Sequence, residues 1–133
     1  VERILMQLLT RQSTDDRIVV HERTWEQFKF IEKGLENLPG VRLSYYEGTI
    51  EILMPGQDHE FFKSIIGMLI EHFFCEIGVE FAPTGSMTQA REGLVSAQSD
   101  ESYCIGNLKP IPDLSIEVTF TSDGLDKLAQ YRA

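Results

Sequence analysis

The stretch IPDLSIEVTF, residues 111–120, has the clearest β-strand pattern in the sequence, and the other elements are assigned outward from it. Side chains alternate between the two faces of a strand, so one face carries Leu114, Ile116 and Val118. The other face carries the polar side chains Asp113, Ser115, Glu117 and Thr119. A carboxylate without a partner is costly to bury. The polar face therefore either meets water or lies against a cationic group.

A second candidate strand, SDESYCIG at residues 99–106, places Asp100, Ser102 and Cys104 on one face. The connection NLKPIP is short, which suits neighbouring strands. If both polar faces lie on the same side of the sheet, Asp100 and Glu117 come close together, and two adjacent carboxylates do not both ionise easily. A divalent cation with oxygen ligands relieves the repulsion, and this ligand type favours Mg²⁺ or Mn²⁺ over zinc. The alternative is that both acids are exposed, on a sheet rim or beside a loop.

Lys127 is the third candidate site residue. It lies in a helix predicted to start at Ser122 or Asp123, close to the end of the 111–120 strand. An ammonium group there could pair with Glu117 or orient an attacking water. The alternative interpretation is an ordinary solvated lysine on a helix.

A histidine lies among acids in GQDHEFF at residues 56–62, where Asp58, His59 and Glu60 precede an apolar helix. Acids at a helix start complement the helix dipole, and Asp58 is a suitable cap. His59 acts as a metal ligand or proton carrier only if it points toward the sheet. The zinc-hydrolase pattern H-E-x-x-H is absent from this stretch.

The remaining patterns predict an α/β domain. TWEQ at residues 24–27 is a capping box, and apolar residues follow at helical spacing until Pro39-Gly40. Residues 41–54 alternate on both sides of Glu47-Gly48, which predicts a β-hairpin. A helix is expected over residues 59–77, with an apolar stripe and Gly78 as its C-cap. The stripe consists of Phe62, Ile65, Ile66, Leu69 and Phe73. Strands follow, and the order favours a mixed sheet covered by helices.

Length and composition limit the function classes. A chain of 133 residues with 42% hydrophobic and 25% charged residues is sized for one domain. Its net charge of −9 is the wrong sign for tight, autonomous DNA binding, although a metal-dependent nuclease remains compatible. Two cysteines, interpreted as buried free thiols, and a start without signal-peptide features predict a soluble cytoplasmic protein. The most apolar helix carries Lys63, Glu71 and His72, so no membrane span is expected.

Several ordered blocks resemble one bacterial family. The blocks are YYEGTIEILMPGQDHE, TGSMT, SDESYCI, PDLSIEV and TSDGLDKLAQYRA. Their order and spacing are similar to those of the Uma-two-type family, a group of restriction endonuclease-like proteins in the PD-(D/E)xK nuclease superfamily. The resemblance runs from about residue 19 to the end of the chain. It implies a single restriction endonuclease-like domain over residues 1–133, a mixed sheet flanked by helices with an N-terminal helix and a β-hairpin, from which the C-terminal part of the family fold is absent.

The resemblance also assigns roles to residues. Asp100 matches the first metal-binding aspartate, with Ser99 in place of the usual proline, and Glu117 matches the acid on the next strand. Thr119 stands where the superfamily has its lysine, and Lys127 is the best match to a lysine moved onto the following helix. His59 and Glu60 match a histidine–acid pair that flanks the site.

The expected function is metal-dependent hydrolysis of phosphodiester bonds in DNA. Asp100 and Glu117 would hold Mg²⁺ or Mn²⁺, and Lys127 would stabilise the developing charge. The alternative is a catalytically inactive interaction module that forms a homodimer. A carboxylate-pair glycosidase is the weakest option, because no aromatic sugar platform is evident near the acids.

Overall fold

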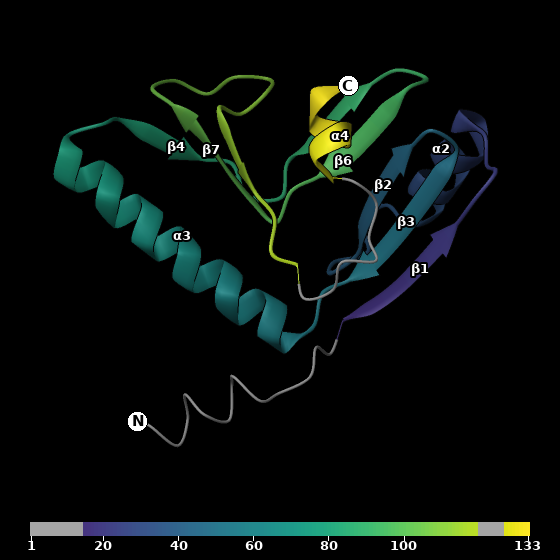
Figure 1. The fold of residues 1–133 in the computed structure, drawn as a ribbon, viewed down its shortest axis with the longest axis horizontal. Coiled ribbons are helices and arrows are strands. Elements are labelled where there is room, and N and C mark those ends of the chain that lie inside the picture. Colours follow the sequence, from purple (N-terminus) through teal and green to yellow (C-terminus); the bar gives the residue numbers. More distant parts are fainter. Residues whose placement is uncertain (1–14, 120–126) are drawn as a thin grey trace.

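The computed structural model describes residues 15–119 and 127–133, which form eight strands and three helices (Figure 1). The strands are β1 (Asp16–Val20), β2 (Arg42–Tyr46), β3 (Thr49–Met54), β4 (Phe81–Pro83), β5 (Thr88–Arg91), β6 (Val95–Gln98), β7 (Glu101–Ile105) and β8 (Leu114–Ile116). The helices are α2 (Trp25–Gly34), α3 (Gln57–Ile77) and α4 (Lys127–Arg132).

The strands form two antiparallel sheets. The larger sheet has the order β1-β3-β2-β6-β5, and the smaller has the order β4-β7-β8. Every strand pair in the described residues is antiparallel, so the prediction of a mixed sheet is wrong. Antiparallel neighbours need only short turns, whereas parallel neighbours need long crossovers. Figure 1 shows α2 against the larger sheet and α3 running beneath the smaller sheet.

The predicted hairpin is confirmed as β2 and β3. Tyr46 pairs with Thr49, and the two turn residues Glu47 and Gly48 have φ angles of 47° and 79°. Positive φ at both central residues is the requirement of a type I′ turn, which matches the twist of the flanking strands. The hairpin carries Arg42 at its start, and this residue proves central to the site.

Helix α2 packs on the larger sheet and forms a hydrophobic core with it. The capping box is present, since Thr24 accepts from the Gln27 N–H and the Gln27 side chain accepts from the Thr24 N–H. The helix ends at Gly34, earlier than the predicted stop at Pro39-Gly40. Its Phe28 is fully buried against Leu43, Tyr45 and Ile50. This cluster fixes β2 and β3, and so the position of the hairpin.

Helix α3 differs from expectation at its start and in its orientation. It begins at Gln57 with Gly56 as the N-cap, so Asp58 is a buried residue of the first turn and not the cap. The predicted C-cap Gly78 is confirmed, with a φ of 72°. Three members of the predicted core stripe are exposed instead, namely Ile65 at 38%, Leu69 at 59% and Phe73 at 56%.

The inward face of α3 is centred on Gly67. The Tyr103 hydroxyl lies 3.4 Å from the Gly67 carbonyl oxygen, and a Cβ at Gly67 would meet that hydroxyl at 3.0 Å. The rings of Phe74, Phe81 and Tyr103 pack with centroids 5.2 to 6.0 Å apart. Apolar residues occur all around this helix, so periodicity alone could not identify its buried face.

Two smaller expectations can be compared with the fold. Cys104 is buried as predicted, whereas Cys75 is exposed, which corrects the prediction of two buried thiols. None of the described helices has both the length and the apolar character needed to cross a membrane.

Candidate functional site

The two predicted acids are brought together where β7 and β8 meet. The pairing of Glu101 with Ile116 places Asp100 opposite Glu117 one residue further along the ladder. The Asp100 N–H donates to the Ile116 carbonyl at 3.0 Å. The next hydrogen bond between the two segments is made by the Asp100 side chain, whose Oδ2 accepts from the Val118 N–H at 2.5 Å. Hydrogen bonds from Asp100 to the residues on both sides of Glu117, one through the backbone and one through the side chain, therefore fix the position of the acid pair.

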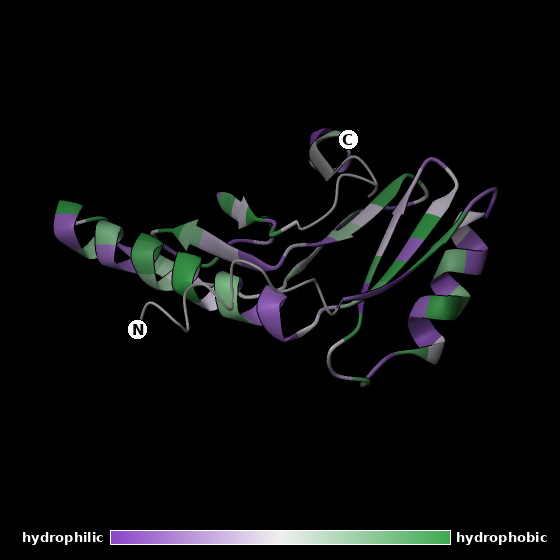
Figure 2. Ribbon diagram, turned by 60° about the horizontal axis from the view of Figure 1, so that its bottom comes forward, coloured by the Kyte–Doolittle hydropathy of each residue, from purple (hydrophilic) through white to green (hydrophobic). Residues whose placement is uncertain are grey.

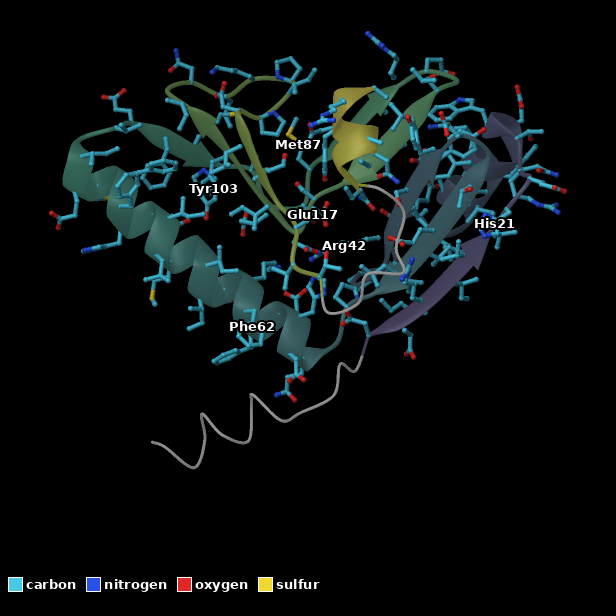
Figure 3. All side chains as sticks on the ribbon, in the orientation of Figure 1. His21, Arg42, Phe62, Met87, Tyr103 and Glu117 are labelled. Carbon is cyan, nitrogen blue, oxygen red and sulfur yellow. The ribbon has the colours of Figure 1, made fainter. Side chains whose placement is uncertain are left out.

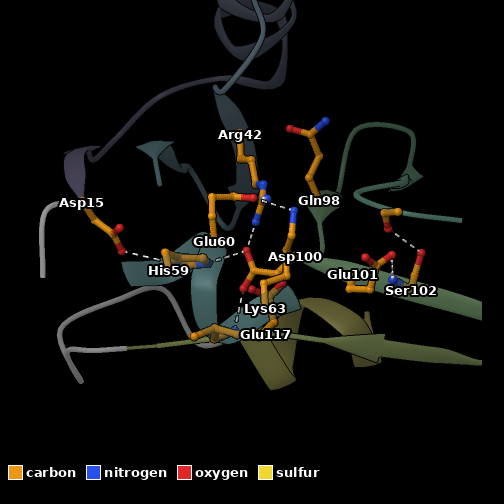
Figure 4. Close-up of polar contacts among 12 residues, drawn as sticks. Asp15, Arg42, His59, Glu60, Lys63, Gln98, Asp100, Glu101, Ser102 and Glu117 are labelled. Atoms are coloured by element: carbon orange, nitrogen blue, oxygen red, sulfur yellow. Dashed lines mark hydrogen bonds and ion pairs between the residues drawn. The ribbon is translucent and has the colours of Figure 1, made fainter. Parts of the chain in front are cut away.

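The Asp100 carboxylate is buried among cationic groups (Figure 4). Its side chain is 1% exposed, and its Oδ1 atom forms ion pairs with Arg42 Nη1 and with His59 Nε2, the latter at 2.7 Å. Arg42 comes from the larger sheet, Asp100 precedes a strand of the smaller sheet, and His59 comes from α3. The site thus lies where both sheets and the start of α3 meet. A buried carboxylate is stable only with such partners.

His59 links Asp100 to a second acid. Its ring is 2% exposed, and its Nδ1 atom lies 3.0 Å from Asp15 Oδ2. The other Asp15 oxygen accepts from the Gly56 N–H at 2.6 Å, directly before α3. Both ring nitrogens therefore face carboxylate oxygens, so the His59 ring bridges Asp15 and Asp100. His59 points toward the site, which meets the condition that the sequence analysis set for a role as a metal ligand or proton carrier.

Two cations line an open cavity beside this buried network. Arg42 Nη2 lies 3.2 Å from Glu60 Oε1, and Lys63 Nζ lies 2.8 Å from Glu60 Oε2. The cavity has a volume of about 290 Å³. It is lined by Gly40, Val41, Arg42, Pro55, Glu60, Lys63 and Ser86. Arg42 therefore reaches from the buried Asp100 to a space large enough for a phosphate group.

Glu117 is held by a tyrosine from α4. The Tyr131 hydroxyl donates to Glu117 Oε1 at 2.6 Å. Burial and the negative charge of Glu117 raise the pKa of Tyr131. Figure 3 shows Glu117 near Arg42, between α3 and the larger sheet. Tyr131 thus fixes one oxygen of the carboxylate that faces the Asp100 network.

The structure describes the backbone of Lys127 but not its side chain. Lys127 is the first residue of α4, and the predicted caps Ser122 and Asp123 lie outside the described part of the chain. The interaction of Lys127 with Glu117 stays a prediction. The described group from this helix that touches Glu117 is Tyr131.

Asp113 does not belong to the acid pair, although it was predicted to share a strand face with Glu117. Strand β8 covers only Leu114–Ile116, and Asp113 lies before it. The Asp113 Oδ2 atom accepts from Lys109 Nζ at 2.5 Å and from the Ile105 N–H at 2.7 Å. The Lys109 ammonium and this N–H lower the pKa of Asp113. Its role is to close the loop between β7 and β8.

Sequence reasoning missed Arg42, Asp15 and Tyr131. Arg42 gave one usable signal, because a charged residue beside the buried Leu43 and Ser44 needs a partner. Asp15 precedes the first strand, and no local pattern distinguishes it. Tyr131 lies in a helix whose charged Lys127 gives the stronger sequence signal. All three contacts join segments far apart in the sequence, which periodicity does not report.

Donor chemistry at the site is compatible with a hard cation. Among residues 15–119 and 127–133, no group of three or more His, Cys, Asp and Glu side chains is gathered as a metal centre. Asp100 and Glu117 nevertheless supply two carboxylates, and Mg²⁺ in proteins is often held by one or two carboxylates with water and phosphate oxygens.

No protein-family model, curated protein or solved structure matches the chain.

Proposed function

We propose that this chain is a metal-dependent endonuclease that hydrolyses phosphodiester bonds in DNA, with Asp100 and Glu117 as the ligands of Mg²⁺ or Mn²⁺. The observation that carries the proposal is the position of the buried Asp100 opposite Glu117, with Arg42 beside it. Two carboxylates on opposite residues of a strand pair repel each other, and a cation bound between them relieves this repulsion. When bound, Mg²⁺ polarises a phosphate and lowers the pKa of a bound water. The resemblance of the sequence blocks to nuclease-fold proteins supports the same assignment.

The chain's own cations would bind the phosphate. The planar guanidinium of Arg42 matches the geometry of a phosphate. Lys63 adds a second positive charge on the same cavity. Glu60 contacts both side chains, and so orients them toward one space. The two cations supply local phosphate contacts in a chain whose net charge is −9.

His59 and Tyr131 would act as positioning residues. His59 holds Asp100 through Oδ1, and Tyr131 holds Glu117 through Oε1. Lys127 precedes Tyr131 by four residues, so the two positions lie on the same face of α4. That placement supports the proposal that Lys127 stabilises charge near Glu117 during hydrolysis.

A catalytically inactive interaction module on the same fold is the second candidate. The observation that favours it is the contact of Asp100 Oδ1 with two nitrogen groups, the Arg42 guanidinium and the His59 ring. These groups balance the buried charge without a metal. Thr119, at the position where the superfamily has a lysine, favours the same alternative.

Plasmid nicking separates the two candidates. The chain is incubated with supercoiled DNA and Mg²⁺ or Mn²⁺, beside Glu117→Gln and the matched control Glu101→Gln. Glu101 is the acid directly after Asp100, and alternation places it on the opposite strand face. The endonuclease proposal predicts metal-dependent nicking that falls by about 100-fold or more in Glu117→Gln and persists in the control. Nicking that is absent, or equal in Glu117→Gln, favours the inactive module.

A further inference from the structure

The outer face of α3 carries a group of exposed apolar side chains. Six large apolar residues of this helix are between 38% and 59% exposed, and Figure 2 shows the helix to be largely hydrophobic along its length. We call this group the outer α3 face. Its members are Phe61, Ile65, Met68, Leu69, Phe73 and Ile77.

The outer α3 face is not the face that packs on the protein. The inward side of the helix meets the smaller sheet through Gly67 and Phe74, which contact Tyr103 and Phe81. Helices with apolar side chains on both sides are usually buried on both sides. The described residues cover only the inward side, so the outer α3 face is suited to a partner.

We propose that a second copy of this chain covers the outer α3 face, in a homodimer whose two-fold axis passes at Leu69. Five members of the face recur at every fourth residue, forming one continuous row. The row is Phe61, Ile65, Leu69, Phe73 and Ile77. Rows of this spacing are the ridges that interlock in the commonest class of helix–helix packing, at a crossing angle of about −50°.

The row is symmetric about its middle residue. Phe61 and Ile77 lie eight positions to either side of Leu69, and Ile65 and Phe73 lie four positions to either side. A two-fold axis at Leu69 therefore sets Leu69 against its own counterpart and Ile65 toward Phe73 of the second copy. A two-fold interface requires this kind of self-complementary patch. The symmetry favours a second copy over an unrelated partner.

The size of the face is sufficient for a dimer. Aromatic side chains each bury about 150–250 Å² when fully covered, and the Ile, Leu and Met side chains of this face are no larger. At roughly half exposure, six of them offer about 500 Å² on each copy, or about 1,000 Å² over both copies. Flanking atoms add to this area. The total reaches the minimum of about 1,000 Å² for a specific interface.

Charge does not oppose the pairing. His72 and Glu76 lie on the outer side of α3, and they pair with each other, with His72 Nε2 lying 3.6 Å from Glu76 Oε1. Neither belongs to the apolar row, so no like charges meet at the axis.

The interface also lies opposite the inward contacts of α3, so it leaves the cavity beside Arg42 open. The proposal is therefore independent of metal binding and nuclease activity.

Sedimentation of the whole chain over a range of micromolar concentrations tests the dimer. We expect a species of twice the chain mass of 15.2 kDa. Leu69→Glu apposes two carboxylates at the axis and should weaken dimerisation by about 100-fold. Leu108→Glu is the matched control, because Leu108 is 74% exposed in the loop between β7 and β8 and is not part of the outer α3 face. It should sediment like the unmodified chain. Circular dichroism verifies that each variant is folded.

A charge-swap mixture tests the position of the axis. Leu69→Lys alone should be monomeric, whereas an equimolar mixture of Leu69→Glu and Leu69→Lys should dimerise to within about 10-fold of the unmodified chain. A second copy with its axis at Leu69 predicts this rescue. The proposal is overturned by a monomeric unmodified chain, by a dimer that Leu69→Glu leaves intact, or by a mixture that stays monomeric. A monomer whose α3 amides resist hydrogen exchange would assign the cover to another part of the same chain.

Discussion

His59 Nε2 lies 2.7 Å from Asp100 Oδ1, and this contact joins the start of α3 to the strand pair that carries the acids. Both side chains are almost completely buried, at 2% and 1% exposure. Each group is a partner for the other in this buried position, where an uncompensated charge is costly. The contact therefore both stabilises the junction of the two sheets and orients the proposed metal ligand.

His59→Ala should destabilise the fold strongly. Removing one partner of a buried ion pair typically costs about 3–5 kcal/mol, and we expect about 3 kcal/mol because Arg42 still pairs with Asp100. Urea unfolding measures the loss. His72→Ala is the matched control on the same helix, since His72 is 73% exposed and should change stability by less than about 0.5 kcal/mol. Equal losses in both variants would contradict the buried network.

Tyr131→Phe should loosen α4 from the site. The variant removes the hydroxyl that donates to Glu117 at 2.6 Å. A hydrogen bond to a charged group is worth about 1.5–3 kcal/mol, and we expect the lower end for a partly buried pair. Thermal unfolding measures this change. Tyr46→Phe, in the hairpin, is the control and should differ from the unmodified chain by less than about 0.5 kcal/mol. A Tyr131→Phe variant as stable as the control would remove the basis for a fixed Glu117.

Phe28→Ala should test the core of the larger sheet. Phe28 is fully buried against Leu43, Tyr45 and Ile50, and truncating a buried phenylalanine costs about 3–5 kcal/mol. The neighbouring Phe30 on the same helix is 78% exposed, so Phe30→Ala should cost less than about 0.5 kcal/mol. Denaturant unfolding of the two variants should separate them clearly. If their order were reversed, the orientation of α2 on the sheet would be wrong.

Asp113→Asn should alter stability in a pH-dependent way. The Lys109 ammonium and the Ile105 N–H favour the ionised carboxylate, so the folded-state pKa of Asp113 lies below its unfolded value. The stabilisation is present above the unfolded value of about 3.9 and is lost as the pH falls through the lower, folded pKa.

The melting temperatures of the unmodified chain and Asp113→Asn should therefore differ at neutral pH and converge in acid. Asp16→Asn, at an exposed position at the start of β1, serves as a control for the loss of one negative charge. If the difference between the unmodified chain and Asp113→Asn grew as the pH fell, the contact of Asp113 with Lys109 would have the wrong sign.

Local signals predicted the parts of the fold that depend on a few adjacent residues. The Thr24–Gln27 capping box, the Glu47-Gly48 turn and the Gly78 C-cap each reflect the geometry of one short segment. Strands β1 and β5 were missed because DRIVV and TQAR show no apolar–polar alternation, and β6 was missed because the alternation of VSAQ rests on small side chains. The identity of the buried face of α3 was also missed, since Gly67 is the residue that admits Tyr103 and a glycine adds no apolar signal.

In the candidate site, too, the contacts between neighbouring strands could be predicted and those between distant segments could not. Asp100 and Glu117 could be paired from strand periodicity, because neighbouring strands bring alternate residues together. Arg42 and His59 reach Asp100 only through the docking of a hairpin and a helix from elsewhere in the chain. Tertiary contacts of this kind leave no periodic trace in the sequence. Asp113 was misplaced because β8 begins later, at Leu114, than its apolar pattern indicated.

Calorimetric titration of Mn²⁺ tests the central claim most directly. The unmodified chain is compared with Glu117→Gln, which keeps the size of the side chain, and with Asp113→Asn, which removes the same charge from the same segment outside the acid pair. The account predicts binding by the unmodified chain and Asp113→Asn, and its loss in Glu117→Gln. Binding that persists in Glu117→Gln, or no binding by any of the three proteins, would contradict a metal site at Asp100 and Glu117.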